Sequence, residues 1–222
     1  MTRHHAHPTQ RARPTEPPSR RAALARPLHH SDVPLARAFR LAAHRDVLPE
    51  AERPSGRATR ESRDVIRRLE PDEVELLKEL RLSALADAPT AYASTYEKEA
   101  AYSDDEWRFL LRADGHPTFV WEAAQGAEGM VVGVHDDDDP EVMHLYAMWV
   151  RPSSRGNGSA DALVARVVTW AGECSAKKVR LHVTVGNHRA ERLYARHGFV
   201  PTGRSQVRER DGLTEIEMEF RS

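Results

Sequence analysis

The chain has 222 residues, enough for one globular domain with an additional segment. Its 33 basic and 34 acidic residues nearly cancel, so the composition as a whole does not indicate a nucleic-acid-binding protein. The single cysteine, Cys174, excludes an intrachain disulfide and is typical of a reducing cytoplasm, where we expect the protein. No apolar run approaches the roughly 20 residues that a bilayer-spanning helix needs, so we expect no membrane association.

Charge is distributed unevenly along the chain. Residues 1–63 hold 13 Arg, no Lys and 6 acidic residues, whereas residues 64–222 hold 20 basic and 28 acidic residues. The first segment is rich in Arg, Pro, His and Ala and poor in aromatic residues, so it would bury too little apolar surface to offset its ordering entropy. We therefore predict a disordered tail at 1–63 and a folded domain at 64–222. The tail could contact an acidic partner, but we favour an extension without one.

The first half of the domain is predicted to contain a strand, two helices and three strands. A strand at 64–69 precedes a helix with apolar residues at helical spacing, which ends before Pro89. The capping box from Ser103 to Glu106 begins the second helix. Strands are expected at 118–123, 129–135 and 142–150. We interpret the acidic run at 136–139 as a solvated hairpin tip, because it lacks the alternating ligands and the turn glycine of a calcium loop.

The second half is predicted to contain two helices and three strands. A helix at 160–175 has a buried apolar face, and a β-branched strand follows at 179–185. A short helix at 190–197 ends at Gly198. Strands at 206–209 and 214–220 form a hairpin around Asp211-Gly212, a dipeptide that favours a type I′ turn. This order of elements predicts an α/β domain with a mixed sheet.

The stretch 145–160 consists of an apolar strand, a short loop rich in Pro and Gly, and the start of a helix. Glycine lets the backbone approach a ligand closely, and the helix start offers N–H groups and the positive end of the helix dipole to an anion. Pyrophosphate is the expected ligand. A connection that binds nothing is the alternative, because short glycine motifs are common.

Two motifs resemble those of the GNAT acetyltransferase superfamily, which binds acetyl-CoA. Arg155-Gly156-Asn157-Gly158-Ser159-Ala160 is similar to its Arg/Gln-x-x-Gly-x-Gly/Ala signature, and the segment from Asn187 to Phe199 is similar to its Asn-x-x-Ala-x-x-Leu-Tyr-x-x-x-Gly-Phe motif. The resemblance extends from about residue 64 to the end. It implies a mixed, mostly antiparallel sheet with flanking helices. The cofactor-binding residues that it implies are Met148, Trp149, Val150, Arg155, Gly156, Asn157, Gly158, Ser159, Ala160, Asn187 and Tyr194.

Three residues depart from the family pattern. Ser159 occupies a position that is usually aliphatic, and Ala160 replaces the more common glycine. Asp161 places a carboxylate near the expected pyrophosphate, where it would favour the helix dipole but repel the ligand if it pointed inward. These departures concern the affinity for the cofactor more than the fold.

The resemblance implies transfer of an acetyl group from acetyl-CoA to a primary amine of a small molecule or protein, by direct attack in a ternary complex. The backbone N–H of Val150 would polarise the thioester carbonyl. Tyr194 would protonate the departing thiolate, with a packing role as the alternative. Asn187 would hold a pantetheine amide or a water, or would simply cap a helix.

The general base is less defined by the sequence. His144 lies on the strand that approaches the loop, and imidazole suits proton transfer near neutral pH. An ordinary strand histidine is the alternative, and Glu122 is a weaker candidate. The connection that contains Tyr92 and Tyr96 corresponds to the region that often lines the acceptor site in the family.

The predicted partners are limited to the cofactor and an amine substrate. We expect a monomer or a homodimer, no bound metal, and no nucleic acid, because the domain is acidic and carries no recognition motif. The alternative function is a catalytically silent regulatory module that binds acyl-CoA. The identity of the acceptor amine does not follow from the sequence.

Overall fold

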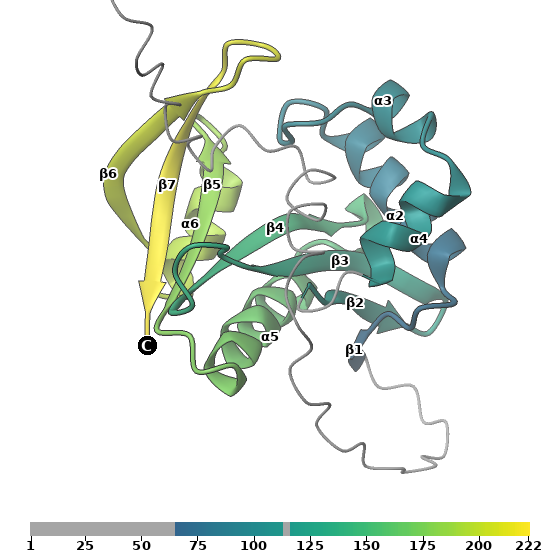
Figure 1. The fold of residues 1–222 in the computed structure, drawn as a ribbon, viewed down its shortest axis with the longest axis horizontal. Coiled ribbons are helices and arrows are strands. Elements are labelled where there is room, and N and C mark those ends of the chain that lie inside the picture. The colour runs from purple at the N-terminus through teal and green to yellow at the C-terminus, as the bar shows by residue number, and fades with distance from the viewer. Residues whose placement is uncertain (1–64, 113–115) are drawn as a thin grey trace, which may run out of the picture.

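The computed structural model describes residues 65–112 and 116–222, which form a seven-stranded mixed sheet with helices on both faces (Figure 1). This confirms the predicted α/β class, whereas the predicted tail at 1–63 lies outside the described residues. Among the described residues, no helix has the length and apolar character needed to cross a membrane. The elements are β1 (Val65–Arg68), α2 (Val74–Asp87), α3 (Tyr96–Ala100), α4 (Asp104–Arg112), β2 (Thr118–Ala123), β3 (Gly126–His135), β4 (Val142–Val150), η3 (Pro152–Ser154), α5 (Ser159–Glu173), β5 (Lys178–Thr184), α6 (His188–Arg196), β6 (Val200–Val207) and β7 (Thr214–Arg221).

The sheet has the strand order β1-β2-β3-β4-β5-β7-β6. All neighbouring strands are antiparallel except β4 and β5. These two strands pair only where Val142–His144 lies beside Lys178–Arg180. Beyond His144 they diverge, and β5, β7 and β6 turn away from β1–β4 (Figure 1). The divergence leaves the last residues of β4 without a hydrogen-bonded neighbour on the β5 side.

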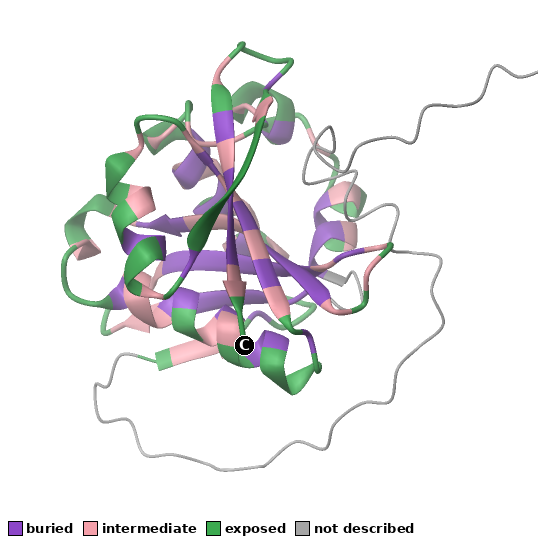
Figure 2. Ribbon diagram, turned by 90° about the vertical axis from the view of Figure 1, so that its left-hand side faces the viewer, coloured by how far each residue is buried: buried purple, intermediate pink, exposed green. Residues whose placement is uncertain are grey.

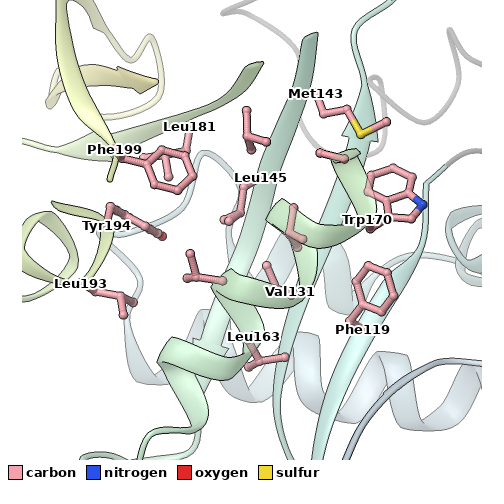
Figure 3. Packing of buried hydrophobic residues seen from close by; sticks show 14 of the residues in the cluster. Phe119, Val131, Met143, Leu145, Leu163, Trp170, Leu181, Leu193, Tyr194 and Phe199 are labelled. Atoms are coloured by element: carbon pink, nitrogen blue, oxygen red, sulfur yellow. The ribbon is translucent and has the colours of Figure 1, made fainter. Parts of the chain in front are cut away.

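Apolar residues form one core on each face of the sheet. Figure 2 shows that the central strands are largely buried. On one face, α5 directs Leu163, Val164 and Val167 into the sheet, as its predicted apolar face requires. Trp170 of α5 packs edge-on against Phe119 of β2, with 6.3 Å between the ring centroids (Figure 3). On the other face, α2 and α4 cover β2, β3 and β4.

The N-terminal helices follow the sequence signals closely. The capping box of α4 is formed: the Ser103 N–H donates to Glu106 Oε2 at 2.9 Å, and the Glu106 N–H donates to Ser103 Oγ at 3.3 Å. Helix α3 was not predicted, because it has only five residues. It begins where Thr95 Oγ1 accepts a hydrogen bond from the Lys98 N–H. A local cap therefore starts a helix too short to show an apolar period.

The predicted C-terminal hairpin forms, with β6 and β7 paired antiparallel, but the predicted type I′ turn is wrong. β6 begins at Val200, six residues earlier than expected, and six residues connect it to β7. Gly212 has φ of 71°, but no other residue in this connection has a positive φ, so a two-residue type I′ turn is excluded. Buried Arg208 instead binds Asp211 at 2.8 Å and Glu215 at 3.1 Å, and these ion pairs hold the longer loop.

The acidic run between β3 and β4 is only partly solvated. Asp138 is exposed as predicted, but the prediction is wrong for Asp136, which is 6% exposed. Asp136 accepts hydrogen bonds from two backbone N–H groups and from His144, so its burial is compensated. Across the described residues, no group of three or more His, Cys, Asp or Glu side chains could hold a metal ion.

Candidate active site

A cavity of about 550 Å³ lies where β4 separates from β5. Its walls come from α2 and the connection after it, the end of β4, the loop before α5, and α6. Segments that are distant in the sequence therefore meet at one place. Nine of the eleven predicted cofactor-binding residues line the cavity: Met148, Trp149, Val150, Arg155, Gly156, Gly158, Ala160, Asn187 and Tyr194.

A β-bulge shapes the cavity wall formed by β4. Tyr146 pairs with Val132 and Trp149 pairs with Met130, so Ala147 and Met148 together lie opposite a single residue of β3. Ala147 has φ of 51°, which is unusual for a residue with a side chain. Such a bulge bends a strand and changes the direction of its side chains. Here it precedes the segment that lines the cavity.

The backbone of Val150 points toward the cavity side of β4. The Arg151 N–H donates to the Glu128 carbonyl at 2.7 Å, which makes these two residues a hydrogen-bonded pair across β3 and β4. In an antiparallel ladder the next pair, Val150 and Gly129, is then of the non-hydrogen-bonded kind. The Val150 N–H and carbonyl therefore face away from β3. The carbonyl accepts a hydrogen bond from Arg155 Nε at 2.8 Å.

The loop before α5 has the backbone conformation that its glycines allow. Gly156 and Gly158 have φ of 88° and 94°, a region that side chains disfavour. The N–H of Ser159 donates to Asn157 Oδ1 at 3.0 Å, and Ser159 Oγ donates to the Ser154 carbonyl at 3.1 Å. Asn157 and Ser159 thus hold the loop and do not line the cavity. The hydrogen bond to the Ser154 carbonyl gives the Ser159 hydroxyl a partner at a position where the family pattern has an aliphatic residue.

Two of the arginines that line the cavity are neutralised by carboxylates. Arg155 forms an ion pair with Asp87, which also accepts a hydrogen bond from Trp149 Nε1 at 2.9 Å. Arg196 binds Asp161 at 2.9 Å. Burial opposes ionisation of Asp161, but hydrogen bonds from Arg196 and His197 outweigh it and lower the pKa of Asp161. The carboxylate that departs from the family pattern is therefore paired within the protein.

Two further arginines leave the cavity with a net positive charge. Arg189 and Arg192 line it and form no ion pair with any residue in the described part of the chain. Together with Arg196 they lie at positions i, i+3 and i+7, which share one face of α6. The sequence reasoning missed these residues and Asp87. The arginine spacing was a signal that could have identified the first three.

Tyr194 and Asn187, both from the second motif, line the cavity. Tyr194 is 7% exposed, its ring lies 5.8 Å from that of Phe199, and it lines the cavity (Figure 3). Burial raises the pKa of Tyr194, so the phenol stays protonated at neutral pH. Asn187 Oδ1 accepts a hydrogen bond from the Ala190 N–H at 3.2 Å. Asn187 is therefore a helix cap as well as a cavity residue.

The two candidate bases have different surroundings. His144 does not line the cavity but lies on β4, at the last residue paired with β5, with its ring stacked on Tyr146 at 5.6 Å. Glu122 is bound by Arg67 at 2.8 Å at the β1 end of the sheet. Its carboxylate is thus paired with an arginine, and it lies away from the cavity. Only His144 is on the strand that leads into the site.

Comparison with known proteins agrees with this architecture. A model of the Acetyltransferase (GNAT) family matches residues 80–199. An N-acetyltransferase of Mycobacterium tuberculosis whose activity is uncharacterized is 37% identical over 81 residues, which are 34% of this chain and 50% of that protein. A protein of Mycobacterium bovis gives the same values. The chain thus spans about half the length of the curated relatives that it matches.

Solved structures share the fold at low sequence identity. A protein from Salmonella typhimurium, solved with its cofactor acetyl-CoA, is 19% identical with a TM-score of 0.62, over 72% of this chain and 94% of that one. Spermidine N-acetyltransferase from Vibrio cholerae, solved with CoA and spermine, is 21% identical with a TM-score of 0.58, over 71% of this chain and 95% of that one.

Proposed function

Because this chain belongs to the GNAT acetyltransferase family, we propose that it transfers an acetyl group from acetyl-CoA to a primary amine of a small molecule or protein. The observation that carries the proposal is the convergence of Val150, the glycine loop and Tyr194 on one cavity at the divergence of β4 and β5. The backbone donor, the anion-binding loop and the proton donor that such a transfer needs are then in the same place.

The residues of the cavity fit the chemical groups of acetyl-CoA. The left-handed glycines and the start of α5 offer backbone N–H groups to a pyrophosphate. Arg189 and Arg192, which form no ion pair within residues 65–112 and 116–222, would bind further phosphate charge. The backbone of Val150 would form hydrogen bonds with the pantetheine amides or with the thioester carbonyl. When bound, acetyl-CoA supplies an activated acetyl group for transfer to the amine.

The residues of the chain would then assist two proton transfers and stabilise the negative charge that develops on the carbonyl oxygen. As the amine nitrogen bonds to the acetyl carbon and the carbon–sulfur bond breaks, the Val150 N–H stabilises the carbonyl oxygen, an interaction worth about two to four kcal/mol. Tyr194 donates its phenolic proton to the leaving sulfur, and its raised pKa keeps that proton available. Asn187, which lines the cavity, would hold an amide of the pantetheine arm or a water.

His144 would accept the proton that the amine loses. It lies four residues before Met148, so along the strand the two Cα atoms are about 13 Å apart or less. The proton would therefore travel through ordered water, or the acceptor would extend along β4 toward the imidazole. Because His144 does not line the cavity, a catalytically silent module that binds acyl-CoA is the alternative.

A test of the proposal begins with the full chain and acetyl-CoA. Calorimetry measures binding, and chromatography measures CoA release with a panel of amines that includes spermidine, aminoglycosides, free lysine and lysine peptides. Binding together with amine-dependent CoA release and an acetylated product supports the enzyme. Tight binding without transfer to any amine supports the silent module. Absence of binding overturns both functions.

A further inference from the structure

Asp136, the first residue after β3, and His144 of β4 form a buried contact. His144 Nε2 lies 2.8 Å from Asp136 Oδ2, and the two residues are 8% and 6% exposed. The other oxygen, Asp136 Oδ1, accepts the N–H groups of Asp138 and Asp139, each at 3.0 Å. The turn therefore orients the carboxylate: Oδ1 binds the two backbone N–H groups and Oδ2 contacts the imidazole.

This arrangement determines the tautomer of His144. Burial opposes ionisation of Asp136, but hydrogen bonds from His144, Asp138 and Asp139 outweigh it and keep the pKa of Asp136 well below its usual range. An ionised carboxylate only accepts hydrogen bonds, so in the neutral imidazole Nε2 must carry the hydrogen. Nδ1 then carries a lone pair. It is buried and has no hydrogen-bond partner among residues 65–112 and 116–222.

We propose that Asp136 is a positioning residue that holds His144 in the Nε2–H tautomer, so that Nδ1, which is closed to solvent here, accepts the amine proton when the bound substrate displaces the side chains that cover it. This inference rests on the proposed function. When Nδ1 takes the proton, the imidazolium gains one positive charge beside a carboxylate that stays ionised, and the Nε2–H bond to Asp136 is kept. Asp136 neither contacts the reacting atoms nor becomes protonated.

A purely structural role would be closure of the turn between β3 and β4. The two backbone hydrogen bonds to Oδ1 already serve that purpose, and an asparagine can keep both of them through its own Oδ1. The Asp136→Asn amide would then present its NH₂ group to the imidazole. A donor there requires Nε2 to become the acceptor and moves the hydrogen to Nδ1. The substitution thus separates turn closure from control of the tautomer.

The test compares the wild-type chain with Asp136→Asn, and uses Asp138→Asn as the matched control in the same acidic run. The chains carry ¹⁵N-labelled histidine, and loss of a signal in His144→Gln assigns the His144 resonances. Spectra at about pH 8, where most imidazoles are neutral, report which ring nitrogen is protonated. Steady-state rates with the amine found in the panel give kcat and KM.

We expect the Nε2–H tautomer in the wild type and in Asp138→Asn, and the Nδ1–H tautomer in Asp136→Asn. In that variant kcat should fall about 10²-fold with little change in the KM for acetyl-CoA. An unchanged tautomer in a folded Asp136→Asn, or a wild-type kcat despite the changed tautomer, would overturn the inference. Failure of the proposed function is distinguishable, because it would appear as absence of transfer by the wild type.

Discussion

The hydroxyl of Tyr92 donates a 3.1 Å hydrogen bond to the carbonyl of Met148, which ties the connection after α2 to the bulge of β4. The Arg81 guanidinium lies 4.8 Å from the centre of the Tyr92 ring and forms a buried ion pair with Glu99 of α3. Burial raises the pKa of Tyr92 to about 12, so the donor keeps its proton. The bulge that shapes the cavity is therefore supported by the connection after α2, which is itself a wall of the cavity.

Removing the Tyr92 hydroxyl should loosen this support. Tyr92→Phe leaves the ring on Arg81 but leaves the Met148 carbonyl without this donor, so we expect a loss of about 1 kcal/mol in the free energy of unfolding. Urea denaturation measures it. Tyr96→Phe is the control, because Tyr96 is 44% exposed and should give no measurable change. Equal stability of the two variants would mean that the hydrogen bond contributes nothing.

Gly158 should be required for the loop that begins α5. At Gly158 φ is 94°, which strains any side chain even though nothing lies within 4 Å of a Cβ there. Gly158→Ala should therefore lower the free energy of unfolding by about 1–2 kcal/mol and weaken acetyl-CoA binding. Gly172 also has open space but lies in the last turn of α5, so Gly172→Ala should raise the free energy of unfolding by up to about 1 kcal/mol. Calorimetry and urea denaturation measure both effects. The critical result is that the two variants change the free energy of unfolding in opposite directions.

Tyr194→Phe should separate proton donation from packing. The ring and its contact with Phe199 remain, so the fold and the affinity for acetyl-CoA should change little. The rate constant of the chemical step should fall about 10²–10⁴-fold, the range for a positioned acid. Single-turnover kinetics with the amine identified in the panel measure this step directly. A wild-type rate constant would assign Tyr194 to packing alone.

His116 should make stability depend on pH. Burial, with a smaller effect of His135, lowers the pKa of His116 to about 4, against about 6.5 in an unfolded chain. Between these values the unfolded chain binds more protons, so stability should fall by about 3 kcal/mol as the pH decreases from 6.5 to 4. Urea denaturation across this range should show a shallower slope for His116→Gln. Parallel slopes would contradict the assignment.

Local sequence signals were sufficient to predict most helices and strands. The period of Leu163, Val164 and Val167 predicted the buried face of α5, and Ser103 with Glu106 predicted the start of α4. Such signals work because propensity, capping and apolar period depend on residues within a few positions of each other. The two motifs similarly predicted Gly158 and Tyr194 as residues of one site.

Only the tertiary structure determined how these residues are used. Arg155 is paired with Asp87, which lies 68 positions away, and Asp136 proved to be buried against a histidine of the next strand. Neither contact has a local signature, because both depend on strand register and on the packing of α2 beside β4. Composition indicates how many charges the chain holds, but only the fold decides which are neutralised and which, like Arg189 and Arg192, form no ion pair within the described residues.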